Sequence, residues 1–388
     1  MSVYCLGNTA YVQWISISQD YSSIQEKPYF YCTKSCTFTF FQHNEQFSAS
    51  FTQFIEDMNH TLHIIVTLRK EKIMKIYTLE QIRKIEKDIP LMVEQLEKGY
   101  EKYSLGETVV PPVGYLHFDE PVGNTYIKYG YVKGDDSFVI KVFNGFPENA
   151  ESGLPTSDGL NMVFDSKTGM TKAILLDEGW LTGFRTAGAT LVCAKHLAPK
   201  HITKVGICGT GTQAHAILSM TPYVLGKQKV VVYGYTKELT DAFVAEFKEK
   251  GFDIEPAYDV KTVCDECNYI VTATTTMTPL ITADMVKPGT HITGVGADAG
   301  GKNEIDASVF AVADLVVNDS RSQCTVDGDT SFALKKGAIK EESIIELGTM
   351  IHDGKGREND DQITVADLTG IAVQNIIAAE MACQLLGE

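Results

Sequence analysis

The chain has 388 residues, enough for two or three domains with substantial hydrophobic cores. Its composition, 44% hydrophobic and 22% charged, is that of an ordinary globular protein. The net charge of −16 argues against a nucleic-acid partner, because phosphate backbones are bound by clustered Lys and Arg side chains. No apolar run approaches the roughly 18 residues of a membrane helix, so no membrane partner is expected. The first residues lack a basic-then-apolar signal pattern, which favours a cytoplasmic location.

Residues 1–73 differ in composition from the rest of the chain. They hold about a third of all aromatic residues, in runs such as 29–31 and 38–41, but show no clear periodicity and no glycine-bounded units. A β-rich extension and a loosely attached arm are both compatible with this pattern. We treat residues 1–73 as an N-terminal extension of unknown role, assign it no chemistry, and expect its deletion to change thermal stability little.

From residue 74 the pattern is that of a folded domain. The capping-box sequence at 78–81 predicts a helix that extends to about Ser104, with a break or kink at Pro90. Strand-like alternation and turn residues over 114–143 and 159–176 then predict an antiparallel sheet.

A second helix is predicted from Thr182, as its N-cap, to Leu197, just before Pro199. Small residues at 187–189 indicate that a neighbouring element packs closely against it. Arg185 falls in the first turn, where a cation opposes the helix macrodipole by about a few tenths of a kcal/mol or more. This placement makes sense if a bound anion completes the site, and a solvated arginine is the alternative.

The stretch 204–214 has the residue order of a βα dinucleotide-binding turn. Apolar residues precede Gly209 and Gly211, and the small Ala214 stands in a helical pattern. Gly209 permits the tight turn, Gly211 lets the backbone approach a pyrophosphate, and the helix N-terminus attracts the phosphates. A glycine-rich turn without a ligand is the alternative, but a second strand at 229–233 follows one helix later, as a βαβ unit requires. The predicted cofactor-binding residues of this turn are Gly209, Thr210, Gly211, Thr212 and Gln213.

This turn belongs to a Rossmann domain that we place at residues 199–320. Strands are expected at 204–208, 229–233, 268–273, 291–295 and 314–318. Thr274, directly after the third of these strands, is a further predicted cofactor contact. An apolar helix from about Thr369 to Leu386 is expected to return to the first domain. The predicted fold class is therefore α/β, with a Rossmann domain and a second, α+β domain built from residues 74–198 and 321–388.

Nine scattered cysteines, an odd number, argue against a complete disulfide framework. Cys264 and Cys267 have the CxxC spacing of a redox or metal pair, but no second CxxC or His pair lies nearby. Two small core residues at a helix end are the better interpretation, and the same holds for Cys32 and Cys36. No metal site is predicted.

Five stretches of the sequence point in one direction when they are taken together. They are 141–149 (KVFNGFPEN), 181–189 (LTGFRTAGA), 206–211 (GICGTG), 294–304 (GVGADAGGKNE) and 367–374 (DLTGIAVQ). In order and spacing they resemble the ornithine cyclodeaminase/mu-crystallin family over roughly residues 75 to 388. The resemblance implies a homodimer in which the second domain serves substrate binding and dimerisation. It also implies hydride chemistry at the α-carbon of an amino or imino acid.

The resemblance carries over to individual residues. Lys141 matches the lysine that holds the substrate carboxylate and Arg185 its arginine partner, and bidentate arginine geometry suits a carboxylate. Apolar neighbours of Lys141 favour this role over that of an exposed strand lysine. Asp298 matches the acid that contacts the reacting amine, and it follows the strand at 291–295, where ligands bind in open α/β sheets. A turn-forming aspartate is the alternative, and Glu304 is expected to brace this loop rather than react.

Two positions depart from the family pattern. Lys128 falls where cyclodeaminases carry a glutamate that handles the hydrolytic water, and a lysine cannot act as that base unless strongly desolvated. The family's additional carboxylate-binding arginine is expected near 113–117, where only His117 could replace it. Lys128 stays a catalytic candidate and His117 a substrate-binding candidate. Both departures disfavour ornithine cyclisation.

The end of the second Rossmann strand indicates which nicotinamide dinucleotide is bound. NAD-selective folds place Asp or Glu there to hold the ribose hydroxyls. Residues 233–237 contain no acid, whereas Thr236 and Lys237, beside Tyr235, could meet a 2′-phosphate. NADPH is therefore favoured over NADH.

The sequence thus predicts an NAD(P)-dependent oxidoreductase that acts at the α-carbon of a small 2-amino or 2-imino acid. Two alternatives stay open. One is an ornithine cyclodeaminase, a lyase that recycles its NAD without net redox change. The other is a non-catalytic protein that binds NADPH and a small acidic ligand.

Overall fold

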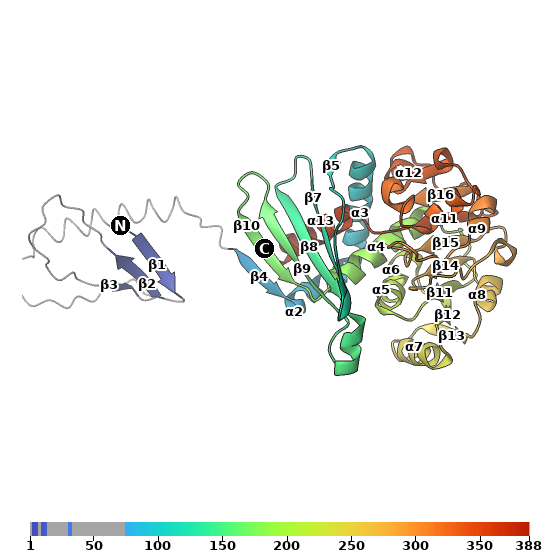
Figure 1. The fold of residues 1–388 in the computed structure, drawn as a ribbon, viewed down its shortest axis with the longest axis horizontal. Helices are drawn as coiled ribbons and strands as arrows, with labels where there is room; N and C mark the ends of the chain where they lie inside the picture. The colour runs from blue at the N-terminus through green and yellow to red at the C-terminus, as the bar shows by residue number, and fades with distance from the viewer. Residues whose placement is uncertain (1, 7–8, 14–29, 33–73, 388) are drawn as a thin grey trace, which may run out of the picture. The chain divides into compact units, whose positions relative to one another are not determined.

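The computed structural model describes residues 2–6, 9–13, 30–32 and 74–387 (Figure 1). The chain divides into two units, residues 1–71 and 72–388. The described strands of the first unit form an antiparallel sheet in the order β1 (Ser2–Leu6), β2 (Thr9–Gln13) and β3 (Phe30–Cys32). The interpretation of Cys36 lies outside the described residues.

A seven-stranded sheet forms one half of the second unit. Its order is β4-β10-β9-β8-β7-β5, with β6 also paired to β7. Strand β4 runs parallel to β10 and every other pair is antiparallel, so the predicted antiparallel sheet is confirmed and gains β4 and β5 at its edges. The strands are β4 (Lys75–Thr78), β5 (Thr108–Val109), β6 (Gly114–Asp119), β7 (Val122–Val132), β8 (Ser137–Gly145), β9 (Ser157–Asp165) and β10 (Thr171–Leu176).

Three long helices lie between this sheet and the other half of the unit (Figure 1): α3 (Ile89–Ser104), α4 (Trp180–Leu197) and α13 (Ala372–Gly387). Helix α13 packs on β7, β8 and β9 as well as on α3 and α4, so the chain's C-terminal segment does return to the first half, as predicted. The first predicted helix is divided into α2 (Leu79–Ile82), a 3-10 segment η1 (Arg83–Asp88) and α3. Its capping box is present, and the break ends immediately before the predicted position, Pro90.

Helix α4 begins earlier than predicted, which corrects one inference. Its N-cap is Gly179, with φ of 80°, and the first turn is fixed by the Asp177 carboxylate, which accepts from the Leu181 N–H at 3.0 Å. Thr182 is therefore inside the helix, and Arg185 lies in the second turn. Because the macrodipole effect fades beyond the first turn, the dipole argument for an anion at Arg185 does not hold.

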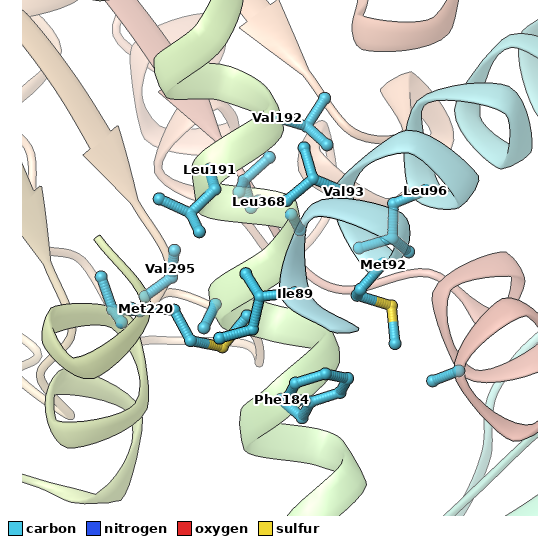
Figure 2. Packing of buried hydrophobic residues seen from close by; sticks show 14 of the residues in the cluster. Ile89, Met92, Val93, Leu96, Phe184, Leu191, Val192, Met220, Val295 and Leu368 are labelled. Carbon is cyan, nitrogen blue, oxygen red and sulfur yellow. The ribbon is translucent and has the colours of Figure 1, made fainter. Parts of the chain in front are cut away.

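The central core is the contact between α3 and α4. Figure 2 shows Met92 and Leu96 of α3 facing α4, and both side chains are fully buried. A Cβ atom at Gly188 would lie 2.6 Å from Leu96, so this glycine is what allows the two helices to approach. The close packing predicted from the small residues at 187–189 is confirmed.

The second half of the unit is an eight-stranded, wholly parallel sheet in the order β13-β12-β11-β14-β15-β18-β16-β17. The strands are β11 (Val205–Cys208), β12 (Lys229–Tyr233), β13 (Asp253–Ala257), β14 (Tyr269–Thr272), β15 (His291–Gly294), β16 (Leu315–Asn318), β17 (Ile344–Glu346) and β18 (Thr364–Asp367). The helices are α5 (Thr212–Met220), α6 (Pro222–Leu225), α7 (Lys237–Glu249), α8 (Val260–Glu266), α9 (Ala307–Val312), α10 (Arg321–Cys324), α11 (Asp329–Lys335) and α12 (Leu347–Asp353). Short 3-10 turns stand at η2 (Pro147–Ser152), η3 (Ala283–Met285) and η4 (Glu341–Ser343).

All five predicted Rossmann strands are present, but the predicted domain boundary at residue 320 is wrong. Strands β17 and β18 belong to the parallel sheet, and β18 even lies between β15 and β16. The reason is that these strands are only three and four residues long and stand in a polar, glycine-containing segment. Such a segment carries no periodic signal, so residues 321–367 were assigned to the wrong half of the molecule.

Cys264 and Cys267 are buried, free thiols at the end of α8, in agreement with their interpretation as core residues. No group of three or more His, Cys, Asp or Glu side chains in the described part of the chain could hold a metal ion. No helix described here is long and apolar enough to cross a membrane.

Candidate active site

A cavity of about 560 Å³ opens between the two sheets. On one side it is lined by β7, β8 and α4, and on the other by α5 and the loop after β15. The segment 368–374 before and at the start of α13 closes a third side. The cavity thus lies at the carboxyl ends of the parallel strands, where ligands bind in open α/β sheets.

The glycine-rich turn forms the dinucleotide side of this cavity. Gly209 has φ of +127°, and a Cβ there would lie 2.5 Å from the Ala273 carbonyl oxygen, so only glycine fits. Gly211 is the N-cap of α5, and a Cβ on it would meet open space. Gln213, in the first turn of α5, lines the cavity, and its buried Oε1 has no hydrogen-bond partner among the described residues. This open backbone at a helix N-terminus fits a bound pyrophosphate.

The two threonines of the turn point in different directions. Thr210 lies against Gly234, where a Cβ would approach its side chain to 2.8 Å, while Thr212 is exposed at the start of α5. Their backbone, more than their side chains, borders the open space.

Thr274 lies beside Gly209, and its backbone N–H and hydroxyl donate to Glu304 Oε1 at 2.6 and 2.7 Å. The buried Glu304 also accepts from the Gly296 N–H at 2.7 Å and from Thr272. Glu304 therefore braces the loop after β15, as expected. Burial first, and then Asp329, raise the pKa of Glu304 to about 7, and the hydrogen bonds from Thr274 and Thr272 oppose this shift.

Two lysines stand opposite each other on the sheet. Lys128 of β7 pairs in register with Lys141 of β8, and Lys141 pairs with Asn161 of β9, so the three side chains share one face. Asn161 donates to Asp177 at 3.0 Å, which links this row to the start of α4. Lys128 donates to the Gly370 carbonyl oxygen, and Lys141 is 4% exposed.

Arg185 projects into the same cavity from α4 and is 7% exposed. Its Nη1 donates to the side-chain oxygen of Gln374, and its Nε has no partner in the described structure. The Thr182 hydroxyl, one turn earlier, is likewise buried and unpaired among the described residues. A guanidinium edge with an unused donor is a ready site for an anion.

Charge crowding marks this cluster as an anion site. Burial first, and then Arg185, lower the pKa of Lys128 to about 8. Burial, Arg185 and Lys128 lower the pKa of Lys141 well below its usual range, and burial lowers that of Arg185. A bound carboxylate would relieve this repulsion, because opposite charge favours the protonated form of each group.

Asp298 lies on the loop after β15 and also lines the cavity, about half exposed, with Lys302 Nζ 2.5 Å from its Oδ1. The structure thus brings Lys128, Lys141, Arg185 and Asp298 to one cavity.

His117 is the predicted substrate residue that the structure does not bring to the cavity. It is exposed on β6, its Nδ1 lies 2.9 Å from Asn124 and its Nε2 3.4 Å from Asp119, and it does not line the cavity. The reason is its position close to the β6–β7 turn. Tyr115, two residues earlier on the same strand face, is the side chain that reaches the cavity instead.

The three residues expected near a 2′-phosphate lie at the end of β12, outside the cavity. Tyr235 is 92% exposed, and the Thr236 hydroxyl caps α7 by accepting from the Leu239 N–H at 3.3 Å. Lys237 pairs with Asp241 and lies 4.8 Å above the ring of Tyr258.

Several cavity residues were missed from sequence. Tyr126 lies two positions before Lys128 on β7, so strand alternation alone could have identified it. Gln323 and Asp327 come from the segment assigned to the wrong half, and Gln374 from the start of α13. No periodic pattern in the sequence places these three at the cavity, because they reach it through contacts between distant parts of the chain.

The model of the ornithine cyclodeaminase/mu-crystallin family matches residues 74–385. An uncharacterized cyclodeaminase of Sinorhizobium fredii is 33% identical, covering 80% of this chain and 95% of the relative.

Two solved structures share the fold. A Thermococcus litoralis Δ1-pyrroline-2-carboxylate reductase in complex with NADH and L-proline has a TM-score of 0.75 at 26% identity, covering 80% of this chain and 97% of that one. An archaeal alanine dehydrogenase dimer with bound NAD has a TM-score of 0.73 at 28% identity, covering 80% and 95%. The chain described here belongs to the ornithine cyclodeaminase/mu-crystallin family.

Proposed function

We propose that this protein is an NAD(P)-dependent oxidoreductase that exchanges hydride at the α-carbon of a small amino or imino acid. The observation that carries the proposal is the cavity itself. It brings together, in one cavity with the first turn of α5, three cations of which Lys141 and Arg185 are buried and Lys128 is half-buried, and that turn is where a dinucleotide's phosphates would be held. The relatives include a pyrroline-carboxylate reductase and an alanine dehydrogenase, which supports the same chemistry.

The chain's own residues divide the work of binding and orientation. Lys141 and the unused donors of Arg185 hold the substrate carboxylate, and Lys128 adds a third positive charge beside them. Asp298, on the opposite side of the cavity, holds the amine or iminium nitrogen. Opposite charges at the two ends of the substrate fix its α-carbon in one orientation. The nicotinamide supplies or accepts the hydride when it is bound.

The cofactor we propose is NADPH, with NADH as the alternative. No acid lies between residues 233 and 237 to hold ribose hydroxyls, and Lys237 is close enough to the end of β12 to turn from Asp241 to a 2′-phosphate. Tighter binding of NADH than of NADPH in a direct titration would contradict this assignment.

The test of function mixes the purified protein with NADPH and a cyclic 2-imino acid and follows the loss of reduced-nicotinamide absorbance against a heat-killed control. Turnover supports the proposal. Arg185→Ala should then raise KM by about a hundredfold, because truncating a buried, hydrogen-bonded charge partner costs about 2–5 kcal/mol. An unchanged KM would contradict the proposed role of Arg185.

A cyclodeaminase activity is the second candidate, favoured by the name of the Sinorhizobium fredii relative. Lys128 speaks against it, since its ammonium donates to the Gly370 carbonyl oxygen and would repel a second amine. Ammonia release from ornithine without net nicotinamide turnover would support this candidate. Tight binding of NADPH and a small acid without any turnover would instead support a non-catalytic binding protein.

A homodimer through the outer face of the seven-stranded sheet completes the proposal. One apolar residue from each of five strands forms a cross-strand row on that face, which we call the outer row. It consists of Ile76, Ile174, Met162, Ile140 and Tyr129. These side chains are exposed or half-buried in the single chain, as expected of a face that a second copy covers.

A further inference from the structure

We propose that Asp319, directly after β16, is a positioning residue that sets the two cations Lys128 and Arg185 through two separate hydrogen-bonded arms. The inference rests on the proposed function, because it assigns what holds the same cavity in shape. Asp319 is fully buried and does not line the cavity, so it acts through other residues.

Five donors converge on the Asp319 carboxylate. The Thr369 N–H and hydroxyl donate to Oδ1 at 3.1 and 3.2 Å, and the Cys324 thiol at 3.3 Å. Oδ2 accepts from the Gly370 N–H at 2.8 Å and from the Gln374 amide at 3.3 Å. Burial raises the pKa of Asp319, and the bonds from Gly370 and Thr369 oppose that shift. Because all five contacts are donors, they favour the ionised form of the carboxylate over its protonated form.

The first arm runs through the backbone of Gly370. Its N–H donates to Asp319, and its carbonyl oxygen accepts from Lys128 Nζ. Gly370 has φ of +78°, and a Cβ there would lie 2.6 Å from Arg185 Nη1. Asp319 therefore fixes a left-handed glycine turn whose carbonyl orients Lys128 and whose missing side chain leaves room for Arg185.

The second arm runs through the Gln374 side chain. Its amide nitrogen donates to Asp319 and to the Tyr100 hydroxyl, which leaves its oxygen facing Arg185 Nη1. If the amide were turned over, its NH₂ group would face the guanidinium and both partners would lose a bond. The Asp319 carboxylate accepts only, so it selects the orientation of Gln374 that can hold Arg185.

Asp319 also acts on Lys128 through its charge. It raises the pKa of this lysine together with Asp298 and Asp327, against the lowering effect of Arg185. Lys141 faces Lys128 across the strand pair as a further cation. Without the negative charge of Asp319, Lys128 should lose its proton at lower pH.

Asp367 offers a matched control. It ends β18, the strand next to β16, and is as deeply buried as Asp319. Its Oδ2 accepts from the Thr330 N–H at 2.8 Å, and among the described residues its carboxylate contacts neither Gly370 nor Gln374. Asp367→Asn therefore tests the loss of a buried carboxylate at the same sheet edge without removing a hydrogen bond from either arm.

The experiment compares wild type, Asp319→Asn, Gln374→Met and Asp367→Asn in the full chain with NADPH and a cyclic 2-imino acid. Asp319→Asn should raise KM about tenfold or more, since hydrogen bonds to charged groups are lost on both arms. It should also move the basic limb of the kcat/KM–pH profile to lower pH, with NADPH affinity unchanged. Gln374→Met should raise KM but leave the limb in place, and Asp367→Asn should leave both as in wild type.

Two outcomes would overturn the positioning role. One is wild-type KM and pH profile in Asp319→Asn. The other is an equal rise in KM in Asp319→Asn and Asp367→Asn, with NADPH affinity reduced in both, which would mean a general structural effect. If Asp319→Asn does not fold, Gln374→Met with a wild-type KM would overturn the arm to Arg185.

Failure of the proposed function can be told apart from these outcomes. If the wild type itself turns over no imino acid, the oxidoreductase assignment fails. The same variants are then compared by calorimetric binding of L-proline to the NADPH-loaded protein. A weaker affinity in Asp319→Asn and in Gln374→Met, with Asp367→Asn as in wild type, still supports the two arms, and equal affinities in all four proteins overturn them.

Discussion

The two faces of the seven-stranded sheet differ completely, although neighbouring residues supply them. On the inner face the row Lys128, Lys141 and Asn161 is polar and covered, and two of its members line or support the cavity. On the outer face the row that includes Ile140 and Met162, one residue away on the same strands, is apolar and partly exposed. Strand alternation thus places a charged site and an unpartnered apolar surface back to back.

The comparison teaches that the cations need support which the sheet alone does not provide. Each inner-row lysine has polar groups from elsewhere in the chain beside it, such as Gly370 for Lys128 and the Asn161–Asp177 pair for Lys141. The outer row has only its own strands. If a second copy covers the outer face, one sheet carries the substrate site on its inner face and the dimer contact on its outer face. Substitutions on the inner face should then lower activity without dissociating the dimer, and substitutions on the outer face should dissociate the dimer without acting on the substrate site.

The largest effect is expected from the inner face. Lys141→Met keeps the apolar stem but removes the charge that faces the substrate carboxylate, so kcat/KM should fall by at least about a hundredfold. Steady-state kinetics with NADPH and a cyclic imino acid measure it. Lys133→Met, at an exposed lysine just beyond β7, is the control and should retain activity. Equal activity of the two variants would remove Lys141 from the site.

A charged substitution on the outer face should change the oligomeric state of the protein and not the chemistry of its active site. Ile140→Asp buries a charge in the middle of the proposed dimer contact, so the variant should elute as a folded monomer while the wild type elutes as a dimer. Size-exclusion chromatography with light scattering measures this. Leu154→Asp changes an exposed apolar residue outside the row and should stay dimeric. A dimeric Ile140→Asp would exclude this face.

A pH profile sharpens the role of Lys128. Its pKa of about 8 means that it carries a charge below this pH and loses it above. Attraction for the substrate carboxylate is then lost, so kcat/KM should decline above about pH 8, up to about tenfold per pH unit. Lys128→Met should abolish this basic limb. A limb that persists in the variant would have to come from another group.

The smallest effect concerns the cofactor's second phosphate. Lys237→Ala should weaken NADPH binding by about three- to tenfold, because an exposed lysine already paired with Asp241 contributes little. NADH affinity should be unchanged, and fluorescence titration of both cofactors measures the contrast. If the affinities for NADPH and NADH fall equally, Lys237 does not contact the 2′-phosphate.

Sequence reasoning succeeded where a residue's role depends on its neighbours in the chain. The turn at Gly209 and Gly211 needs a glycine for its φ or its open space, and that requirement is local. Lys141 and Arg185 could be placed because their flanking residues carry a family pattern.

It failed where a role depends on contacts across the chain. His117 lies on the same strand as the cavity residue Tyr115, but two residues closer to the β6–β7 turn, and it does not line the cavity. Asp319 and Gln374 come into contact only after β16 and α13 have packed. Strand β18 has four residues, too few to show a recognisable strand pattern in the sequence. Short strands that pair over long distances in the chain show no hydrophobic periodicity from which their pairing could be predicted.

The late position of Gly370 and Gln374 in the chain has a consequence for the order in which the site forms during biosynthesis. They are 242 and 189 residues further along the chain than their partners Lys128 and Arg185. A chain cut or stalled before residue 370 would therefore carry every cation of the site but neither of the groups that accept hydrogen bonds from Lys128 and Arg185. Competence to bind a carboxylate would then arise only after both sheets and the first turn of α13 have been synthesised.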